Sequence, residues 1–193
     1  WGEFGAKLPT MMSGSFALAV LEPLRKRAFL AIDRMGVERL CYARRDAELV
    51  FGASAQSVTL HPAVGRDIDP QAIYDYLYFQ MIPSPRTLYR GVEKLLPGQS
   101  LLLDNGEARL DFYWQADYAA ETGRAFDSYR GSFRELLKQA VGSAAEHSRV
   151  AVFLSGGTDS STVAGPLTEL SGAPVGPFPL SDDPHGFDEM AYE

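Results

Sequence analysis

Residues 150–165, VAVFLSGGTDSSTVAG, join an apolar run to a segment rich in glycine and serine. A loop that leaves a buried strand and enters a helix exposes backbone N–H groups at the positive end of the helix dipole, where anions bind. Gly156 and Gly157 let the backbone approach an anion closely, and Ser155 and Ser160 can donate further hydrogen bonds. The segment therefore favours a binding loop for a compact anion such as a phosphate group.

Asp159, in the same segment, points to a metal ion as well. A carboxylate repels phosphate directly, but it can hold a Mg²⁺ ion that bridges to phosphate oxygens. The spacing is not that of the Walker loop, which needs a lysine after its second glycine, nor that of the dinucleotide fingerprint. From residue types alone, a tight strand-to-helix turn without any ligand stays open as the alternative.

The segments around this loop predict the opening of an α/β unit. A helix over residues 126–148, capped at Asp127, precedes the apolar strand, and a second strand follows over 174–180. Pro166 casts doubt on the length of the helix after the loop. Prolines in the second strand also fit a central strand poorly.

The first 116 residues are predicted to be rich in β-structure, with one helix near their middle. Within the run 67–81, Asp69 suits a helix N-cap and Pro70 suits the first helical position, so a helix is expected from Pro70 onward. Asn105-Gly106 favours a type I′ turn between alternating segments. Short apolar runs joined by polar turns predict hairpins over residues 14–34, 39–54 and 98–114.

Composition excludes several classes of protein. Of the 193 residues, 46% are hydrophobic and 22% are charged, which is ordinary globular usage and argues against disorder and membrane spanning. A net charge of −7 argues against a nucleic-acid partner. Cys41 is the single cysteine, so no internal disulfide forms, and we expect a buried thiol in a cytoplasmic protein.

SGGTDSS after an apolar strand resembles the pyrophosphate loop, SGGxDS, of the ATP pyrophosphatase superfamily, which cleaves ATP between its α and β phosphates. The upstream segments are similar to glutamine-hydrolysing asparagine synthetases, and so is "PFPLSDDPHGFDEMAYE" downstream. The upstream segments are "SGSFALAVLEPLRKRAFLAIDRMGVERLCYA", "LVFGASAQSV" and "HPAVGRDIDPQAIYDYLYFQMIPSPRTLYRGVEKLLPGQSLLL". The resemblance extends over nearly the whole chain.

The resemblance implies two domains. Residues 1–116 would be the C-terminal part of a class II glutamine amidotransferase domain, an α+β fold of the N-terminal-nucleophile type with antiparallel sheets and helices. Residues 117–193 would begin an α/β, Rossmann-like ATP-pyrophosphatase domain, the asparagine synthetase part.

The resemblance also implies site residues, with ATP and Mg²⁺ as the bound groups. Asp159 would hold the metal, while Leu154 and Leu180 would line the adenosine pocket. The residues implied in binding ATP and its pyrophosphate are Leu154, Ser155, Gly156, Gly157, Asp159, Ser160 and Leu180. Asp182, Asp183, Asp188 and Glu189 are further metal candidates, although a solvated acidic loop is the simpler interpretation.

The implied activity is asparagine biosynthesis: adenylation of the aspartate side chain with release of pyrophosphate, then amidation by ammonia from glutamine. Partners would be small molecules, namely aspartate or another carboxylate, glutamine and ATP, with no nucleic acid or membrane and with a homodimer left open. Two alternatives remain. One is a related adenylating cyclase or amide ligase without glutaminase activity, as in β-lactam synthetases and lasso-peptide cyclases. The other is a degenerate domain used for assembly.

No catalytic site is expected to be complete within these residues. The nucleophile of the family is a cysteine at the first position of the mature chain, and position 1 here is Trp1. Later synthetase motifs would lie beyond Glu193. We therefore expect the sequence to be part of a longer protein, inactive on its own, whose intact mass exceeds 21.1 kDa.

Overall fold

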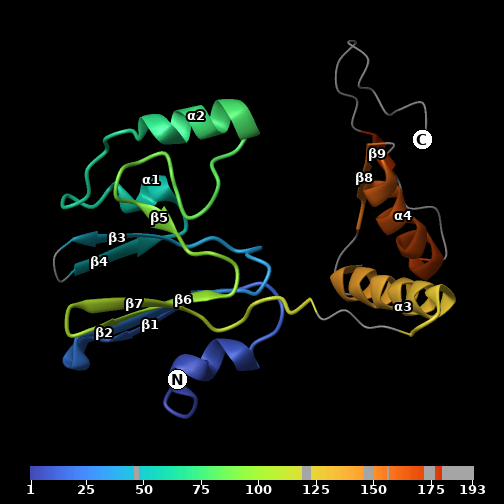
Figure 1. Cartoon of the computed structure of the whole chain (residues 1–193), viewed down its shortest axis with the longest axis horizontal. Coiled ribbons are helices and arrows are strands. Elements are labelled where there is room, and N and C mark those ends of the chain that lie inside the picture. Colours follow the sequence, from blue (N-terminus) through green and yellow to red (C-terminus); the bar gives the residue numbers. More distant parts are fainter. Residues whose placement is uncertain (46–47, 119–122, 146–149, 156, 172–176, 180–193) are drawn as a thin grey trace. The chain divides into compact units, whose positions relative to one another are not determined.

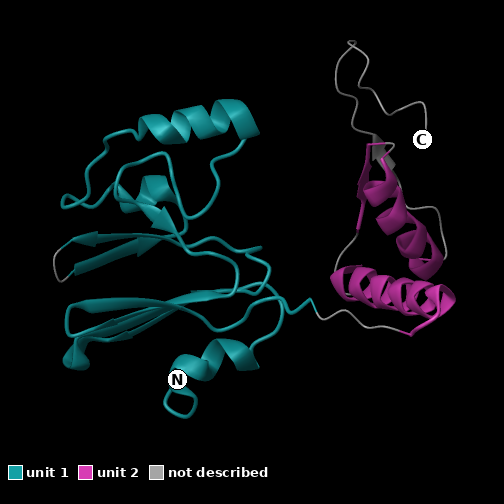
Figure 2. Cartoon of the chain, in the orientation of Figure 1, with its two compact units in different colours: residues 1–118 teal, residues 119–193 magenta. Residues whose placement is uncertain are grey.

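The chain divides into two compact units, unit 1 (Trp1–Tyr118) and unit 2 (Ala119–Glu193), in the computed structural model (Figures 1 and 2). None of the helices in the described part is long and apolar enough to cross a membrane. The structure describes residues 1–45, 48–118, 123–145, 150–155, 157–171 and 177–179.

Unit 1 is built from two antiparallel sheets, which Figure 1 shows as layers one above the other. Its strands are β1 (Ala17–Glu22), β2 (Arg27–Ile32), β3 (Cys41–Arg45), β4 (Glu48–Gly52), β5 (Glu93–Lys94), β6 (Gln99–Asp104) and β7 (Glu107–Phe112). The first sheet has the order β1-β2-β6-β7 and the second the order β4-β3-β5. The three predicted hairpins are confirmed as the antiparallel pairs β1/β2, β3/β4 and β6/β7.

The turn between β6 and β7 confirms the role predicted for Asn105-Gly106. The backbone φ angles are +49° at Asn105 and +89° at Gly106. A type I′ turn requires positive φ at both central residues, which asparagine and glycine tolerate. The turn therefore sets the pairing of Asp104 with Glu107 and the register that follows from it.

The main core of unit 1 lies between the two sheets. Leu30 and Leu101, from the first sheet, belong to the same buried cluster as Tyr42, from the second. Side chains from two facing sheets fill one core in this way when the sheets pack face to face. On the other face of the first sheet, the ring of Trp1 lies 4.9 Å from that of Phe29, so β2 is covered on both sides.

A second, smaller core lies on the outer side of the second sheet. Cys41 and Ala43 from β3 pack there with Val58 from the short helix α1 (Ala55–Val58). The side chain of Ser54 caps this helix by accepting a hydrogen bond from the Ser57 N–H. The predicted burial of the Cys41 thiol is confirmed.

Helix α2 (Pro70–Phe79) begins where the sequence predicts. Asp69 is the N-cap and accepts a hydrogen bond from the Gln71 N–H, and Pro70 holds the first position. Ala72 is its buried residue, whereas its large apolar side chains are exposed. The helix is therefore held by a small contact and leaves most of its apolar surface open.

Unit 2 contains α3 (Phe126–Ala145), β8 (Val152–Leu154), α4 (Thr158–Ser171) and β9 (Pro177–Pro179). The strands β8 and β9 pair in parallel, as an α/β unit requires. Prolines at both ends of β9 do not prevent this pairing, because each strand of a two-stranded sheet keeps one free edge, where proline is tolerated.

Two details of the unit 2 helices differ from the prediction. Asp127 is not the N-cap of α3, because the helix already begins at Phe126 and the carboxylate lies in the first turn, where the helix dipole favours it. Pro166 does not end α4, which continues to Ser171. A proline inside a helix costs about 3 kcal/mol. Burial of the next residue, Leu167, helps to offset that cost.

Asp33 follows β2 directly and fixes the loop that leads to β3. Its carboxylate is buried and accepts hydrogen bonds from the N–H groups of Met35, Val37 and Glu38 at 3.1, 3.0 and 2.9 Å. Burial raises the pKa of Asp33, but these backbone donors outweigh it and hold the pKa below its ordinary 3.8. The residue therefore has a structural role.

We expect Asp33→Asn to destabilise unit 1 by about 1–3 kcal/mol, because the amide cannot replace a carboxylate that accepts three hydrogen bonds. Because the folded-state pKa is lowered, this contribution is present above the ordinary pKa and is lost as the pH falls through the folded-state value. Urea unfolding at neutral and acidic pH measures it. Asp117→Asn, at an exposed carboxylate, is the matched control, and an equal effect of both variants would contradict the prediction.

Candidate functional site

The predicted anion-binding loop lies between β8 and α4. The chain leaves the strand at Leu154 and enters the helix at Thr158. Leu154 is level with Pro179 of the parallel strand β9, so the two strands end at the same edge of their sheet. In open α/β sheets ligands bind beyond the carboxyl ends of the strands, and the loop occupies that position.

Ser160 is the centre of a hydrogen-bond network that closes this loop. Its hydroxyl donates to the Gly157 carbonyl at 3.1 Å and accepts from the Ser155 N–H at 3.3 Å. The hydroxyl of Ser155 accepts from the Gly157 N–H at 3.3 Å and lies 3.3 Å from the Ser160 hydroxyl. Two side chains five residues apart therefore hold the backbone of the turn, whereas the sequence predicts that these serines donate hydrogen bonds to a bound anion.

The loop leads into α4, a helix of 14 residues. The first N–H groups of a helix lack partners within it and carry the positive end of the dipole. Ser160 lies in this first turn and Ser155 faces it through the hydroxyl contact, so both hydroxyls adjoin these N–H groups. The N–H groups that open α4 are therefore the donors that the hydrogen bonds of the loop leave available to a phosphate-sized anion.

Asp159 lies in the first turn of α4 and is exposed. Within the described ranges, no group of three or more histidine, cysteine, aspartate or glutamate side chains could hold a metal ion by itself. Proteins often bind Mg²⁺ through one or two carboxylates together with the phosphates of a substrate. A nucleotide phosphate on the loop and the Asp159 carboxylate would share the ion.

The remaining predicted site residues divide into two groups. Leu154 is the last residue of β8 and is partly buried. The others lie outside the described residues, and the roles assigned to them remain predictions: Gly156, Leu180, Asp182, Asp183, Asp188 and Glu189.

An ion pair that the sequence did not reveal joins the two helices of unit 2. The ammonium of Lys138 on α3 lies 2.5 Å from the carboxylate of Glu169 on α4. The hydrogen bond from Lys138 lowers the pKa of Glu169. Both side chains remain accessible, so the pair adds little to the contact between α3 and the C-terminal end of α4.

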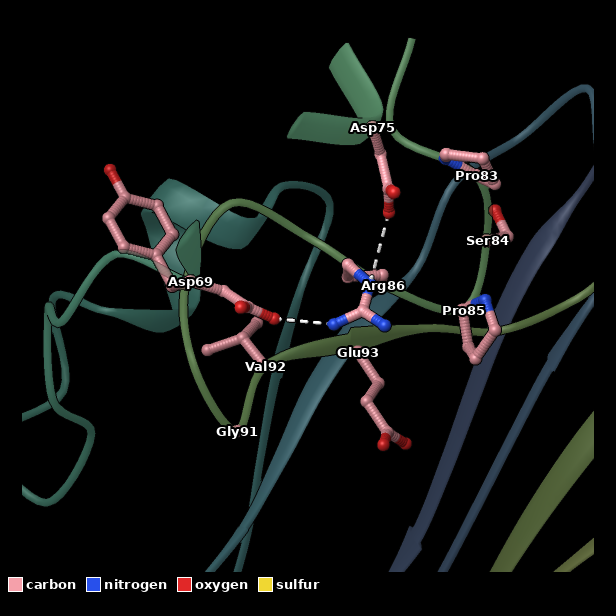
Figure 3. A pocket seen from close by; sticks show the side chains of 10 residues that line it. Asp69, Asp75, Pro83, Ser84, Pro85, Arg86, Gly91, Val92 and Glu93 are labelled. Carbon is pink, nitrogen blue, oxygen red and sulfur yellow. Dashed lines mark hydrogen bonds and ion pairs between the residues drawn. The ribbon is translucent and has the colours of Figure 1, made fainter. Parts of the chain in front are cut away.

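A polar cavity in unit 1 was also not foreseen from the sequence (Figure 3). Arg86 lies between two carboxylates of the α2 region, 2.6 Å from Asp69 and 3.3 Å from Asp75. Glu93, on the opposite side, accepts a hydrogen bond of 2.6 Å from the Tyr42 hydroxyl. Since these charged groups are already bound to partners, we interpret the cluster as a clamp on α2.

Comparison with known proteins assigns the two parts of the chain. The model of the glutamine amidotransferase domain matches residues 1–114. The chain belongs to the glutamine amidotransferase family. The model of asparagine synthase matches residues 132–193, so the start of an asparagine synthase domain follows the amidotransferase domain.

Several curated proteins are similar to this chain. Asparagine synthetase [glutamine-hydrolyzing] 3 of Bacillus subtilis is 27% identical over 79% of the chain and 25% of its own length. Putative asparagine synthetase [glutamine-hydrolyzing] 2 of Methanocaldococcus jannaschii is 29% identical over 89% of the chain and 34% of its length. Amidase chry2 of Gibberella zeae is 30% identical over 87% of the chain and 25% of its length. The chain therefore spans a quarter to a third of these relatives.

We expect Ser160→Ala to open the loop locally. Removing the hydroxyl deletes the acceptor of the Ser155 N–H, and a hydrogen bond of this kind contributes about 0.5–1.5 kcal/mol, or roughly a 2- to 10-fold change in opening. Amide hydrogen exchange at Ser155, followed by NMR, should be faster by that factor. Ser161→Ala, at an exposed neighbour, should leave it unchanged. Unchanged exchange in Ser160→Ala would show that the network does not hold the loop.

Proposed function

We propose that the chain is part of an ATP-dependent amidotransferase of the asparagine synthase (glutamine-hydrolysing) type. The observation that carries the proposal is the loop between β8 and α4, with Ser155 and Ser160 hydrogen-bonded around Gly157 at the carboxyl end of a parallel strand pair. The hydroxyls of Ser155 and Ser160 hold the turn itself, and the exposed Asp159 beside them offers a carboxylate to a Mg²⁺ ion carried by a bound phosphate. The match of residues 132–193 to the asparagine synthase model supports the same conclusion.

In this proposal the loop acts on the pyrophosphate end of ATP. The β-carboxylate of aspartate attacks the α-phosphorus, the bond to the β-phosphate oxygen breaks, and pyrophosphate leaves with the electron pair. The N–H groups that open α4 would stabilise the charge that grows on this leaving group, and the hydroxyls of Ser155 and Ser160 would join them by exchanging their hydrogen bonds within the loop for contacts to the phosphate. Asp159 would hold Mg²⁺, which neutralises phosphate oxygens. Ammonia from glutamine then displaces AMP and forms the amide.

The finer description of the fold belongs to the same proposal. Unit 1 would be part of an N-terminal-nucleophile-type amidotransferase fold, consistent with its facing antiparallel sheets. Unit 2 would open a Rossmann-like ATP-pyrophosphatase domain, consistent with the parallel pair β8/β9. Burial of the free Cys41 thiol is in keeping with a reducing cytoplasm.

A second candidate is amide chemistry on a carboxylate other than aspartate, as in an adenylating ligase. Two relatives motivate it, because they bear the name amidase and not asparagine synthetase: chry2 of Gibberella zeae and chyE of Penicillium rubens, the latter 29% identical over 87% of the chain. The loop would bind pyrophosphate in the same way in both reactions. The two candidates therefore differ in the acceptor and not in the residues of the loop.

The test is exchange of labelled pyrophosphate into ATP with Mg²⁺, measured on the protein isolated at its native length. Exchange that requires L-aspartate would support asparagine synthase, and exchange with another carboxylate would support the second candidate. We expect Asp159→Asn to lower the exchange rate by about 10- to 100-fold, as is typical when support for a metal is lost.

Asp127→Asn is the matched control, because this aspartate also lies in the first turn of a unit 2 helix but away from the loop. Its exchange rate should equal that of the unchanged protein. If Asp159→Asn binds MgATP as before and no carboxylate supports exchange, the loop is only a turn and the proposal fails.

A further inference from the structure

A second cavity of unit 1 lies next to the C-terminal end of α2 and has a volume of about 450 Å³. Its apolar lining includes Tyr76 and Met81, which are exposed, and Leu40 and Leu95, which are buried. Small-molecule sites are usually hollows of this size, lined mostly by apolar side chains with a few polar groups among them. We call this cavity the α2 groove.

Lys94 is the partly buried charge of the α2 groove. Its ammonium donates a hydrogen bond of 2.9 Å to the Ile82 carbonyl, and among the described residues no carboxylate forms an ion pair with it. Burial and the nearby charge of Arg39 lower the pKa of Lys94, which means that its charged form is stabilised too little by its surroundings. An ammonium has three N–H donors, so two remain for a ligand.

The other charged groups of the α2 groove leave it with a net positive charge. Arg39 and Glu38 also line it, both are exposed, and neither side chain has a hydrogen-bond or ion-pair partner in the part of the chain that the structure describes. Two cations therefore face one carboxylate, in a chain whose net charge is −7. A ligand carboxylate would supply the counter-ion that Lys94 lacks, through hydrogen bonds strengthened by charge.

The wall of the α2 groove is formed before any ligand arrives. Asp75, the residue before Tyr76, lies 3.3 Å from Arg86, and Arg86 also pairs with Asp69 at the start of the helix (Figure 3). This clamp fixes the turn of α2 that carries Tyr76. A site that is ordered in advance loses less entropy when it binds its ligand.

We infer that the α2 groove binds a small carboxylate with an apolar body, such as an aryl or alkyl carboxylic acid. The carboxylate would accept hydrogen bonds from the two remaining donors of Lys94, and the body would lie against Tyr76 and Met81. A phosphate monoester, with a charge of roughly −2, would meet a single partly buried cation and is disfavoured. The site consists of unit 1 residues alone and is independent of the proposed reaction.

Titration of the full 193-residue chain with phenylacetate, followed by NMR of the backbone amides, tests the inference. We expect saturable shifts of the Met81 and Leu95 signals. The Kd should rise at least tenfold in Lys94→Gln, because hydrogen bonds to a charged group are lost. Lys7→Gln is the matched control, since Lys7 is an exposed lysine of unit 1 outside the groove, and its Kd should not change.

Phenylacetamide, which has nearly the same shape but no charge, separates recognition of the carboxylate from apolar binding. It should bind the unchanged chain at least tenfold more weakly than phenylacetate does. This comparison needs no substitution, so it decides the matter even if a variant does not fold. Tyr76→Ala should weaken the binding of phenylacetate about 2- to 10-fold by removing an aromatic contact.

Four results would overturn the inference. They are shifts that do not saturate, shifts centred outside the α2 groove, an unchanged Kd in a folded Lys94→Gln variant, and equal binding of phenylacetate and phenylacetamide. A groove that another part of the chain already fills would give no saturable shift at Met81 and Leu95, and that result counts against the inference as well. Circular dichroism establishes whether each variant is folded.

Discussion

Burial of β2 on both faces is the constraint on which unit 1 depends. Ala28 to Ile32 form a run of buried residues with no polar side. Their side chains point to both faces of the strand, so both faces must be covered to keep them from water. The second sheet covers one surface, and the N-terminal segment with Trp1 covers the other. The strand then ends at Asp33, whose carboxylate satisfies the backbone N–H groups of the loop and turns the chain toward β3. Apolar burial and one buried charge thus determine how the two sheets are connected.

Local chemistry made the hairpins and the start of α2 predictable from the sequence. Asn105-Gly106 and Asp69-Pro70 act within a few residues, so no distant contact is needed to interpret them. The loop after β8 was predictable for the same reason, because the glycines and serines that form it are neighbours in the sequence. Asp127 misled the prediction because a capping residue and a first-turn acid look alike in sequence. Pro166 misled it because its cost is offset by packing, which only the folded helix pair reveals.

What the sequence could not show are contacts between distant segments. The pairing of Arg86 with Asp69 joins residues 17 apart, and that of Lys138 with Glu169 joins different helices. Neither arises from a local pattern, since long charged side chains are ordinary on any surface. Exposure of the large apolar side chains of α2 was equally hidden, because helical spacing of apolar residues predicts an amphipathic helix but not what covers it. In both units, then, local motifs placed the elements, and long-range contacts oriented them.

Cys41 has a practical consequence as the only thiol in the chain. It lies in the central strand of the second sheet, under α1, and burial raises its pKa. Both properties suppress reaction with a thiol reagent while the sheet is closed, because the thiolate is the reactive form. Modification of this residue therefore requires the strands to separate. The rate at which a thiol reagent labels Cys41 then reports how often unit 1 opens. Opening of unit 1 can therefore be followed without introducing a second cysteine.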